Sequence, residues 1–152
     1  MNHPSRIYIA ADHNGFALKE RLVAWLRGAG HIVEDLGASQ HDPGDDYSTY
    51  GIKLGEAVAA HPGTVGIALC GSGQGIALAA NKVRGVRAAV PWNPAIAMDS
   101  RTDDDANVLC LAADYLDQPL TEQIVQAWLA TPFSGEARHR ARIAEIERYE
   151  AQ

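Results

Sequence analysis

The chain has 152 residues, enough for one domain with a full hydrophobic core and too few for two domains of ordinary size. Its 13 Lys and Arg residues against 19 Asp and Glu residues give a net charge of −6, which argues against nucleic acid and anionic membranes as partners and favours a small molecule. No apolar run reaches the roughly 20 residues that span a bilayer, and residues 1–5 lack the apolar segment of a signal peptide, so we expect a cytoplasmic protein.

Short apolar runs alternate with segments of helical spacing along the whole chain. The pattern predicts, in order, a strand over 7–11, a helix over 16–27, a strand over 31–36, a helix over 47–60, a strand over 64–69, a helix after the glycine-rich turn at 70–75, a strand over 86–90, a short helix after Pro91 and Pro94, a strand over 107–111, a helix over 120–129 and a charged helix over about 136–150. Residues 37–46 are too rich in turn formers for regular structure. Strands that alternate with helices pair in parallel through right-handed crossovers, so we expect an α/β fold with a parallel sheet in a single domain over 1–152.

The stretch Cys70-Gly71-Ser72-Gly73-Gln74-Gly75 lies between a predicted strand and the apolar helix that follows it. Its three glycines let the backbone approach a ligand closely, and the start of the helix would direct unpaired N–H groups toward an anion. The same positive helix end would favour the thiolate form of Cys70. Cys70, Ser72 and the N–H groups of the turn therefore predict proton transfer or nucleophilic chemistry beside an anionic group, as the stabilisation of an enediolate requires.

Other interpretations of this turn are weaker or stay open. The dinucleotide fingerprint G-x-G-x-x-G would need glycine at position 76, where Ile76 stands, and a Walker-type phosphate loop does not occur in the sequence. Cys70 also fits a small buried residue at a strand end, and Cys110, at the end of another apolar run, is expected to belong to the core. Two cysteines in such settings do not indicate a disulfide framework, so both are expected to be reduced.

Two pairs of polar residues are further candidates for ligand binding. Asp12 and His13 follow the first strand, where His13 is placed to contact a phosphate or a sugar hydroxyl. Asp12 or Asn14 also fits an ordinary helix N-cap. Arg138 and Arg142 lie four residues apart on the last predicted helix, so they form either a phosphate clamp or a solvated basic face.

In open parallel sheets, ligands bind at the carboxyl ends of the strands near the point where strand order reverses. The segments 12–13, 70–75 and 103–105 each lie next to a predicted strand, so we expect them to border one such crevice. A metal site made of Asp103, Asp104 and His13 is a weaker alternative, because their spacing matches no metal motif.

Several segments of the chain match the motifs of one known family. They are Asp12-His13-Asn14-Gly15 with Leu18-Lys19, Asp46-Tyr47, Cys70 to Ile76, Ala79-Ala80-Asn81-Lys82 with Gly85-Val86-Arg87-Ala88, Asn107-Val108-Leu109, and Arg138-His139 with Arg142. Through them the chain resembles the ribose-5-phosphate isomerase B and galactose-6-phosphate isomerase family over nearly its whole length. The resemblance implies a Rossmann-like three-layer α/β/α sandwich with a five-stranded parallel sheet and a C-terminal helical arm. It also implies a homodimer or a dimer of dimers with shared active sites, and aldose–ketose isomerisation of sugar phosphates without a metal or other cofactor.

The resemblance also assigns roles to individual residues. Cys70 is the base that moves a proton between C1 and C2 of the sugar, with help from Ser72, and backbone N–H groups hold the enediolate oxygens. The substrate-binding positions are Asp12, His13, Tyr47, Gly71, Gly73, Gly75 and, for the phosphate, Arg138 and Arg142. The helix over about 136–150 is expected to pack on the partner subunit.

The acidic loop before the last predicted strand departs from the family pattern. Family members commonly carry His-Asn where this chain has Asp103 and Asp104, and that histidine opens the sugar ring in the neighbouring subunit's site. By position, Asp103 takes the catalytic place and Asp104 a substrate-binding place, but an ionised aspartate is a poor proton donor at pH 7. Asp105 is expected to be a solvated loop residue. A second departure is Asp114, which stands where many relatives have a phosphate-binding arginine and would repel a phosphate.

The residues and the resemblance together predict an aldose–ketose isomerase with Cys70 as base and a cis-enediolate intermediate. Its substrate is expected to be a sugar phosphate of the pentose phosphate pathway, such as ribose 5-phosphate and ribulose 5-phosphate. The two departures leave alternatives open: an isomerase of a tetrose phosphate, which has no ring to open, an isomerase of an unphosphorylated sugar, or a non-catalytic protein that binds a sugar or a phosphate.

Overall fold

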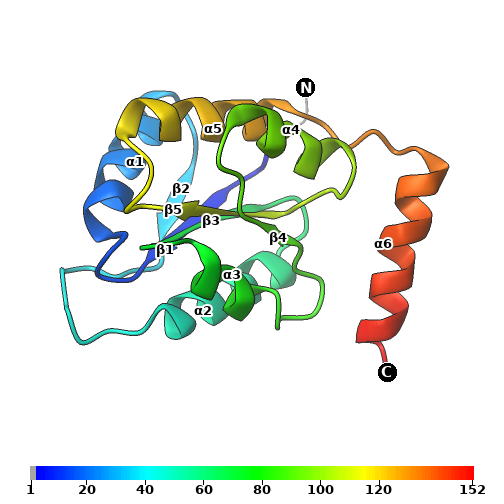
Figure 1. Ribbon diagram of the computed structural model, residues 1–152, viewed down its shortest axis with the longest axis horizontal. Coiled ribbons are helices and arrows are strands. Elements are labelled where there is room, and N and C mark those ends of the chain that lie inside the picture. Colours follow the sequence, from blue (N-terminus) through cyan, green and yellow to red (C-terminus); the bar gives the residue numbers. More distant parts are fainter. Residues whose placement is uncertain (1–2) are drawn as a thin grey trace.

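All five predicted strands are present in the computed structural model, which describes residues 3–152 (Figure 1). In chain order the elements are β1 (Ile7–Ala11), α1 (Phe16–Gly28), β2 (Val33–Asp35), α2 (Tyr47–Ala60), β3 (Val65–Cys70), α3 (Gln74–Ala80), β4 (Ala88–Ala89), α4 (Pro94–Thr102), β5 (Val108–Ala112), α5 (Gln118–Ala130) and α6 (Ala137–Glu150). Every element for which both bounds were predicted lies within two residues of them. No helix within residues 3–152 is long and apolar enough to cross a membrane.

The strands form one parallel sheet in the order β2-β1-β3-β5-β4. β2 and β4 are its edge strands and are shorter than the predicted 31–36 and 86–90. From β1 the chain crosses to β2 on one side and then returns to β3 on the other. Strand order therefore reverses between β1 and β3, the position at which sheets of this type bind ligands.

Helices cover both faces of the sheet, which explains why its strands are apolar throughout. α1, α4 and α5 lie on one face and α2 and α3 on the other (Figure 1). Side chains along each strand alternate between two cores: Ile67 and Leu69 of β3 pack with the first group of helices, and Ala68 and Cys70 with the second. The predicted three-layer α/β/α sandwich is confirmed.

α6 stands beside the N-terminal ends of the strands, apart from the sandwich (Figure 1). Among its described residues only His139 is buried. Its contacts with the body include Glu150, whose Oε2 accepts from the N–H of Gly85 at 3.1 Å, and Glu147, whose Oε1 lies 4.0 Å from Nη1 of Arg87. The C-terminal helix is therefore an arm, as predicted.

The contact between α2 and α3 depends on Gly51. A Cβ atom at this position would lie 2.8 Å from both Ala79 Cβ and the backbone oxygen of Ile76. Because α3 begins directly at the glycine-rich turn, this close helix contact also helps to fix the turn.

Gly51→Ala is expected to lower the free energy of unfolding by about 1–3 kcal/mol, because the added methyl group forces the two helices apart. Gly28→Ala, at the end of α1, is the matched control: a Cβ there meets nothing within 4 Å. Its stability should stay unchanged or rise by up to about 1 kcal/mol. Urea denaturation followed by circular dichroism measures both variants, and equal stability of the two would contradict the packing argument.

Candidate active site

The carboxyl ends of β1, β3 and β5 lie together at one end of the strands, which we call the turn edge. β1 pairs with β3 through Ala11 and Leu69, and the N–H of Asp12 donates to the Leu69 oxygen at 3.3 Å. On the other side of β3, Cys70 pairs with Ala112. The turns that follow these three strands therefore lie side by side where strand order reverses.

The glycine-rich turn after β3 is closely surrounded. A Cβ atom on Gly71 would lie 2.6 Å from Asp114 Oδ2, and one on Gly75 would lie 2.6 Å from the ring of Tyr47. Gly73 has a φ of +73°, a left-handed conformation that favours glycine. Within the described chain, the N–H groups of these three glycines donate to no protein acceptor. Free N–H groups around a left-handed glycine form an arrangement that binds anions.

The two cysteines occupy different settings. Cys70 is the last residue of β3, 4% exposed, and directly precedes the free N–H groups. Cys110 is fully buried in β5, and burial, with a smaller contribution from Cys70, raises the pKa of its thiol. Neither forms a disulfide in the described chain, as predicted. Cys110 is thus a neutral core residue, and Cys70 is the thiol at the candidate site.

Ser72 and Tyr47 present exposed hydroxyl groups beside the turn. Ser72 Oγ accepts a hydrogen bond from the N–H of Gln74 at 3.3 Å, which leaves its hydroxyl hydrogen available to donate. Tyr47 is the first residue of α2 and is 45% exposed, with its ring against Gly75. Both side chains can therefore contact a ligand bound at the turn.

Asp12 shapes the turn between β1 and α1. Its Oδ1 accepts hydrogen bonds from the N–H groups of Asn14 at 3.0 Å and Gly15 at 3.1 Å. Burial raises the pKa of the Asp12 carboxyl, although the bond from Gly15 opposes this. Asp12 therefore shapes the turn before α1 and places His13 at the same edge. The expectation that Asp12 or Asn14 is the N-cap of this helix is wrong, because Gly15 occupies that position and no side chain caps it.

His13 is held by Asp45, a residue of the loop between β2 and α2. Asp45 Oδ1 accepts from the His13 ring Nδ1 at 2.8 Å and from its backbone N–H at 2.9 Å. Among the described residues, Asp12, His13 and Asp45 form the one group whose side-chain ligand atoms all lie within 4.8 Å of one another. A cation bound through Nδ1 would break the bond to Asp45, so the geometry favours a hydrogen-bonded unit over a metal site.

The acidic loop lies at the opposite, amino-terminal end of the strands, which we call the arm edge. Asp103 to Asp105 precede β5, and the residue just before that strand, Asn107, accepts from the N–H of Gly66 near the start of β3 at 2.9 Å. Cys70 lies four residue steps further along β3 than Gly66, a distance of about 13 Å. The expectation that this loop borders the same crevice as Cys70 is therefore wrong within one chain, because parallel strands place the residues before them and after them at opposite edges.

The residues of the acidic loop have partners of their own. Asp105, expected to be a solvated loop residue, instead bridges two arginines: its Oδ1 accepts from Arg101 at 3.0 Å and its Oδ2 from Arg87 at 3.3 Å. Asp103 Oδ1 lies 3.6 Å from Nε2 of the buried His139. The loop and the start of α6 are therefore held together as one group.

Arg138 and Arg142 are exposed on α6, as is Asp104 in the loop. Arg138 Nε donates to Glu136 Oε2 at 2.8 Å. The predicted site residues therefore fall into two sets. The turn edge holds Asp12, His13, Tyr47, Cys70, Gly71, Ser72, Gly73 and Gly75, and the arm edge holds Asp103, Asp104, Arg138 and Arg142.

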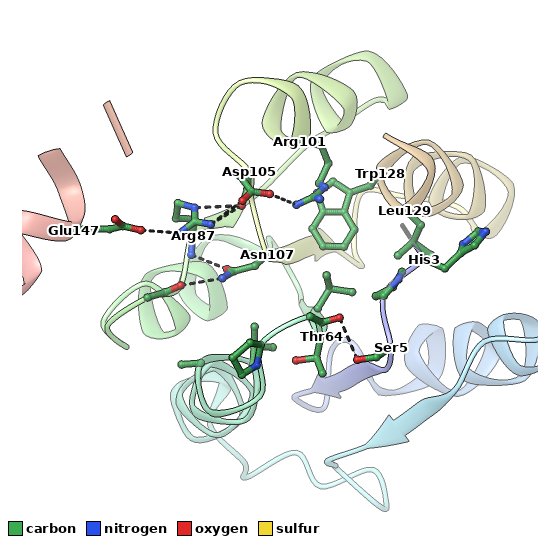
Figure 2. A pocket seen from close by; sticks show the side chains of 17 residues that line it. His3, Ser5, Thr64, Arg87, Arg101, Asp105, Asn107, Trp128, Leu129 and Glu147 are labelled. Carbon is green, nitrogen blue, oxygen red and sulfur yellow. Dashed lines mark hydrogen bonds and ion pairs between the residues drawn. The ribbon is translucent and has the colours of Figure 1, made fainter. Parts of the chain in front are cut away.

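A hollow of about 670 Å³ opens at the arm edge (Figure 2). Figure 2 shows Asp105 between Arg87 and Arg101, with Glu147 of α6 beside Arg87. Trp128 forms another wall, 5.4 Å from the Arg101 guanidinium. Cys70 is not among the described residues that line the hollow, so the hollow and the glycine-rich turn are separate places in the structure.

Two residues of the turn edge were not predicted to belong to the site. Asp45 lies in a loop with Asp42 and Asp46, and no spacing distinguishes it from them. Asn14 was considered only as a helix cap, yet its Nδ2 lies 3.2 Å from the position of a Cβ on Gly71. Both contacts join different turns, so linear spacing carries no signal for them.

Comparison with known proteins agrees with this geometry. A family model described as Ribose/Galactose Isomerase matches residues 7–146. The ribose-5-phosphate isomerase B of Mycobacterium tuberculosis is 37% identical over 145 residues, which cover 95% of this chain and 90% of that protein. The Clostridium thermocellum ribose-5-phosphate isomerase B structure has a TM-score of 0.92 and 39% identity, and covers 96% of this chain and 97% of its own.

The ribose-5-phosphate isomerase B of Mycoplasma genitalium, solved with bound ribulose-5-phosphate, has a TM-score of 0.93 and 37% identity, with 97% of both chains covered. Family match, identity and fold agree over nearly the whole chain. The chain belongs to the Ribose/Galactose Isomerase family.

Proposed function

We propose that this protein is an aldose–ketose isomerase that interconverts sugar phosphates such as ribose 5-phosphate and ribulose 5-phosphate. The observation that carries the proposal is the position of Cys70, directly before the free N–H groups of a glycine-rich turn at the reversal of strand order. Family membership supports it, as does the Mycoplasma genitalium relative solved with ribulose-5-phosphate. The cytoplasmic location expected from the sequence stays a prediction.

The reaction needs a base and a site for a transient anion, and the turn offers both. The Cys70 thiolate takes the proton from C2 of the open-chain aldose, and the electron pair moves to form a cis-enediolate. N–H groups of the turn donate to the enediolate oxygens as negative charge develops. The Cys70 thiol then returns its proton to C1, and the hydroxyl proton passes from O2 to O1, for which the Ser72 hydroxyl is a suitable relay. Atoms and charge balance without a cofactor.

The active form proposed is a homodimer in which each site combines the turn edge of one chain with the arm edge of its partner. Neither edge of one chain has the full set of groups, because the two lie about 13 Å or more apart. Large apolar side chains near the arm and on the α3 to α4 side are exposed, including Leu78, Trp92, Met98, Ile146 and Tyr149. A partner that covers them would remove an unfavourable contact with water.

In this assembly the exposed Arg138 and Arg142 of α6 would bind the phosphate in the partner's site, since guanidinium groups recognise phosphate oxygens in pairs. Asp103 and Asp104 would enter the same site with the arm. An ionised Asp103 cannot readily protonate a ring oxygen, so we propose that ring opening depends on another group or occurs before binding.

A second candidate function is favoured by the position of Asp114. Its carboxylate lies against Gly71, where it repels an anion and accepts hydrogen bonds from hydroxyl groups. An isomerase of an unphosphorylated sugar fits this feature. An isomerase of a tetrose phosphate, which has no ring to open, fits the aspartate at position 103 instead. A non-catalytic binding protein is the remaining alternative.

Cys70→Ala is expected to lower isomerisation by about 10²–10⁴-fold, because the proton at C2 loses its base. Cys110→Ala is the control with the same side-chain change outside the site. Incorporation of solvent deuterium at C1 or C2, followed by proton NMR over a panel of aldoses, ketoses and their phosphates, measures both variants. Exchange that survives in Cys70→Ala would refute the assignment of the base, and no exchange on any sugar with the native chain would favour the binding protein.

The shared site can be tested by mixing two inactive proteins, Cys70→Ala and Arg138→Ala/Arg142→Ala. If each site uses Cys70 from one chain and the arginines from the other, random exchange of subunits restores about a quarter of the native sites. If each site used residues of one chain only, every site in the mixture would stay defective. Activity of the mixture after refolding together, against the two proteins refolded separately, decides between these outcomes.

Asp103→His with Asp114→Arg is expected to raise kcat/KM for ribose 5-phosphate by about tenfold or more, which corresponds to about 1.4 kcal/mol of transition-state stabilisation. The first change supplies a ring-opening donor and the second replaces a repulsive charge by an attractive one. Asp99→Asn, which alters an exposed acidic residue of α4, is the control. Unchanged kinetics in the double variant would mean that the two aspartates do not determine the substrate.

A further inference from the structure

Asp45 holds both the ring and the backbone of His13, whereas substrate binding by His13 would require only its ring. One carboxylate oxygen, Oδ1 of Asp45, accepts both the ring Nδ1 hydrogen bond and the backbone N–H of the same histidine, at 2.8 and 2.9 Å. The two residues are 32 positions apart in the chain and belong to different turns. The pair therefore fixes the backbone and the ring of His13 together.

The carboxylate is poorly hydrated. The Asp45 side chain is 8% exposed, and its second oxygen, Oδ2, is buried without a hydrogen-bond partner among the described residues. A buried carboxylate is costly unless a positive group balances it, and the imidazolium of His13 is the group in contact. The contact with the Asp45 carboxylate therefore favours the charged form of the histidine.

The remaining ring nitrogen is the one available to a ligand. Nδ1 is occupied by Asp45, and the His13 side chain is 28% exposed, so Nε2 is left as the second donor of the imidazolium. The hydrogen bond to Asp45 raises the pKa of His13, desolvation opposes the change, and Asp12, Asp45 and Asp42 add smaller favourable charge effects. The His41 ring, 6.3 Å away, is the other titratable group that faces it.

We infer that Asp45 is a positioning residue that holds His13 with its Nε2–H free to donate to an anionic group of the substrate, a phosphate oxygen. The inference rests on the proposed function for the identity of the ligand, but not for the geometry. It assigns to the turn edge a cation of its own, in addition to the arginines that the partner's arm would bring. The phosphate end of the substrate then lies toward His13, and the reacting carbons lie toward Cys70.

The test compares Asp45→Asn with Asp42→Asn. Asparagine at 45 keeps an acceptor for the backbone N–H but removes the charge, so the pKa of His13 should fall, and the imidazolium should be lost at a lower pH than in the native chain. Asp42 lies in the same loop and is exposed, so Asp42→Asn controls for a general change in charge. A pH titration of the imidazole nitrogens by NMR, with His13 assigned from its absence in His13→Gln, measures the effect.

Inorganic phosphate is the ligand probe. At a pH where native His13 is still charged and His13 of Asp45→Asn is not, phosphate binding should weaken by about tenfold in Asp45→Asn and little in Asp42→Asn. With a phosphorylated substrate, KM of Asp45→Asn should begin to rise at a lower pH than native KM, with a smaller change in kcat. An unchanged His13 titration and unchanged phosphate affinity in Asp45→Asn would overturn the inference.

A double-mutant cycle separates positioning from a purely structural role. If Asp45 acts through His13, Asp45→Asn should weaken phosphate binding in the native background and have no further effect in the His13→Gln background. Equal effects in both backgrounds would refute the positioning role. Should Asp45→Asn unfold, Asp45→Ser keeps a shorter acceptor and allows the same cycle. Phosphate binding requires no turnover, so it can be measured even if the protein isomerises no sugar. That result would refute the proposed function, and the phosphate measurements would still test the role of Asp45.

Discussion

The buried parallel sheet is the constraint on which the rest of the structure depends. Helices cover both of its faces, so the polar groups available to a ligand lie at the two ends of the strands, the turn edge and the arm edge. Because the strands are parallel, all residues that follow a strand lie at the turn edge, and all residues that precede a strand lie at the arm edge. Cys70 is the last residue of β3 and Asp103 precedes β5, so the fold itself separates Cys70 and the glycine-rich turn from the acidic loop and the arm.

This separation explains why the arm, α6, cannot complete the site of its own chain in the proposed dimer. α6 buries only His139 among its described residues, and it holds Arg138 and Arg142 away from the turn of its own chain. The contacts of Asp103 with His139 and of Glu147 with Arg87 join loop and arm into one unit. Within the proposed dimer, such a unit would deliver its arginines and its aspartates to the partner's site together, so a change in the loop also changes the setting of the arginines.

Sequence reasoning reached the fold because the fold depends on local patterns. Apolar runs and helical spacing are properties of neighbouring residues. They placed β1 and α2 at their observed bounds, and they made the edge strands β2 and β4 one or two residues too long at each end. The glycine-rich turn was also visible, because its residues are contiguous. The role of Asp45 could not be predicted, because it depends on a contact between residues 32 positions apart. The position of Asp103 was predicted wrongly, because it depends on which end of the parallel strands the loop lies at.

The charges around the turn favour one orientation of a bound substrate. The Asp114 carboxylate lies against Gly71, so a dianionic phosphate is disfavoured there, whereas sugar hydroxyl groups can donate to it. The hydrogen bond to Asp45 raises the pKa of His13 and so favours its imidazolium form, which in the proposed orientation would attract the phosphate. The free N–H groups of the turn directly follow Cys70. In the proposed orientation, a sugar phosphate would present C1 and C2 to the thiol and its phosphate to His13, and the same arrangement would also accept a sugar whose ring never closes.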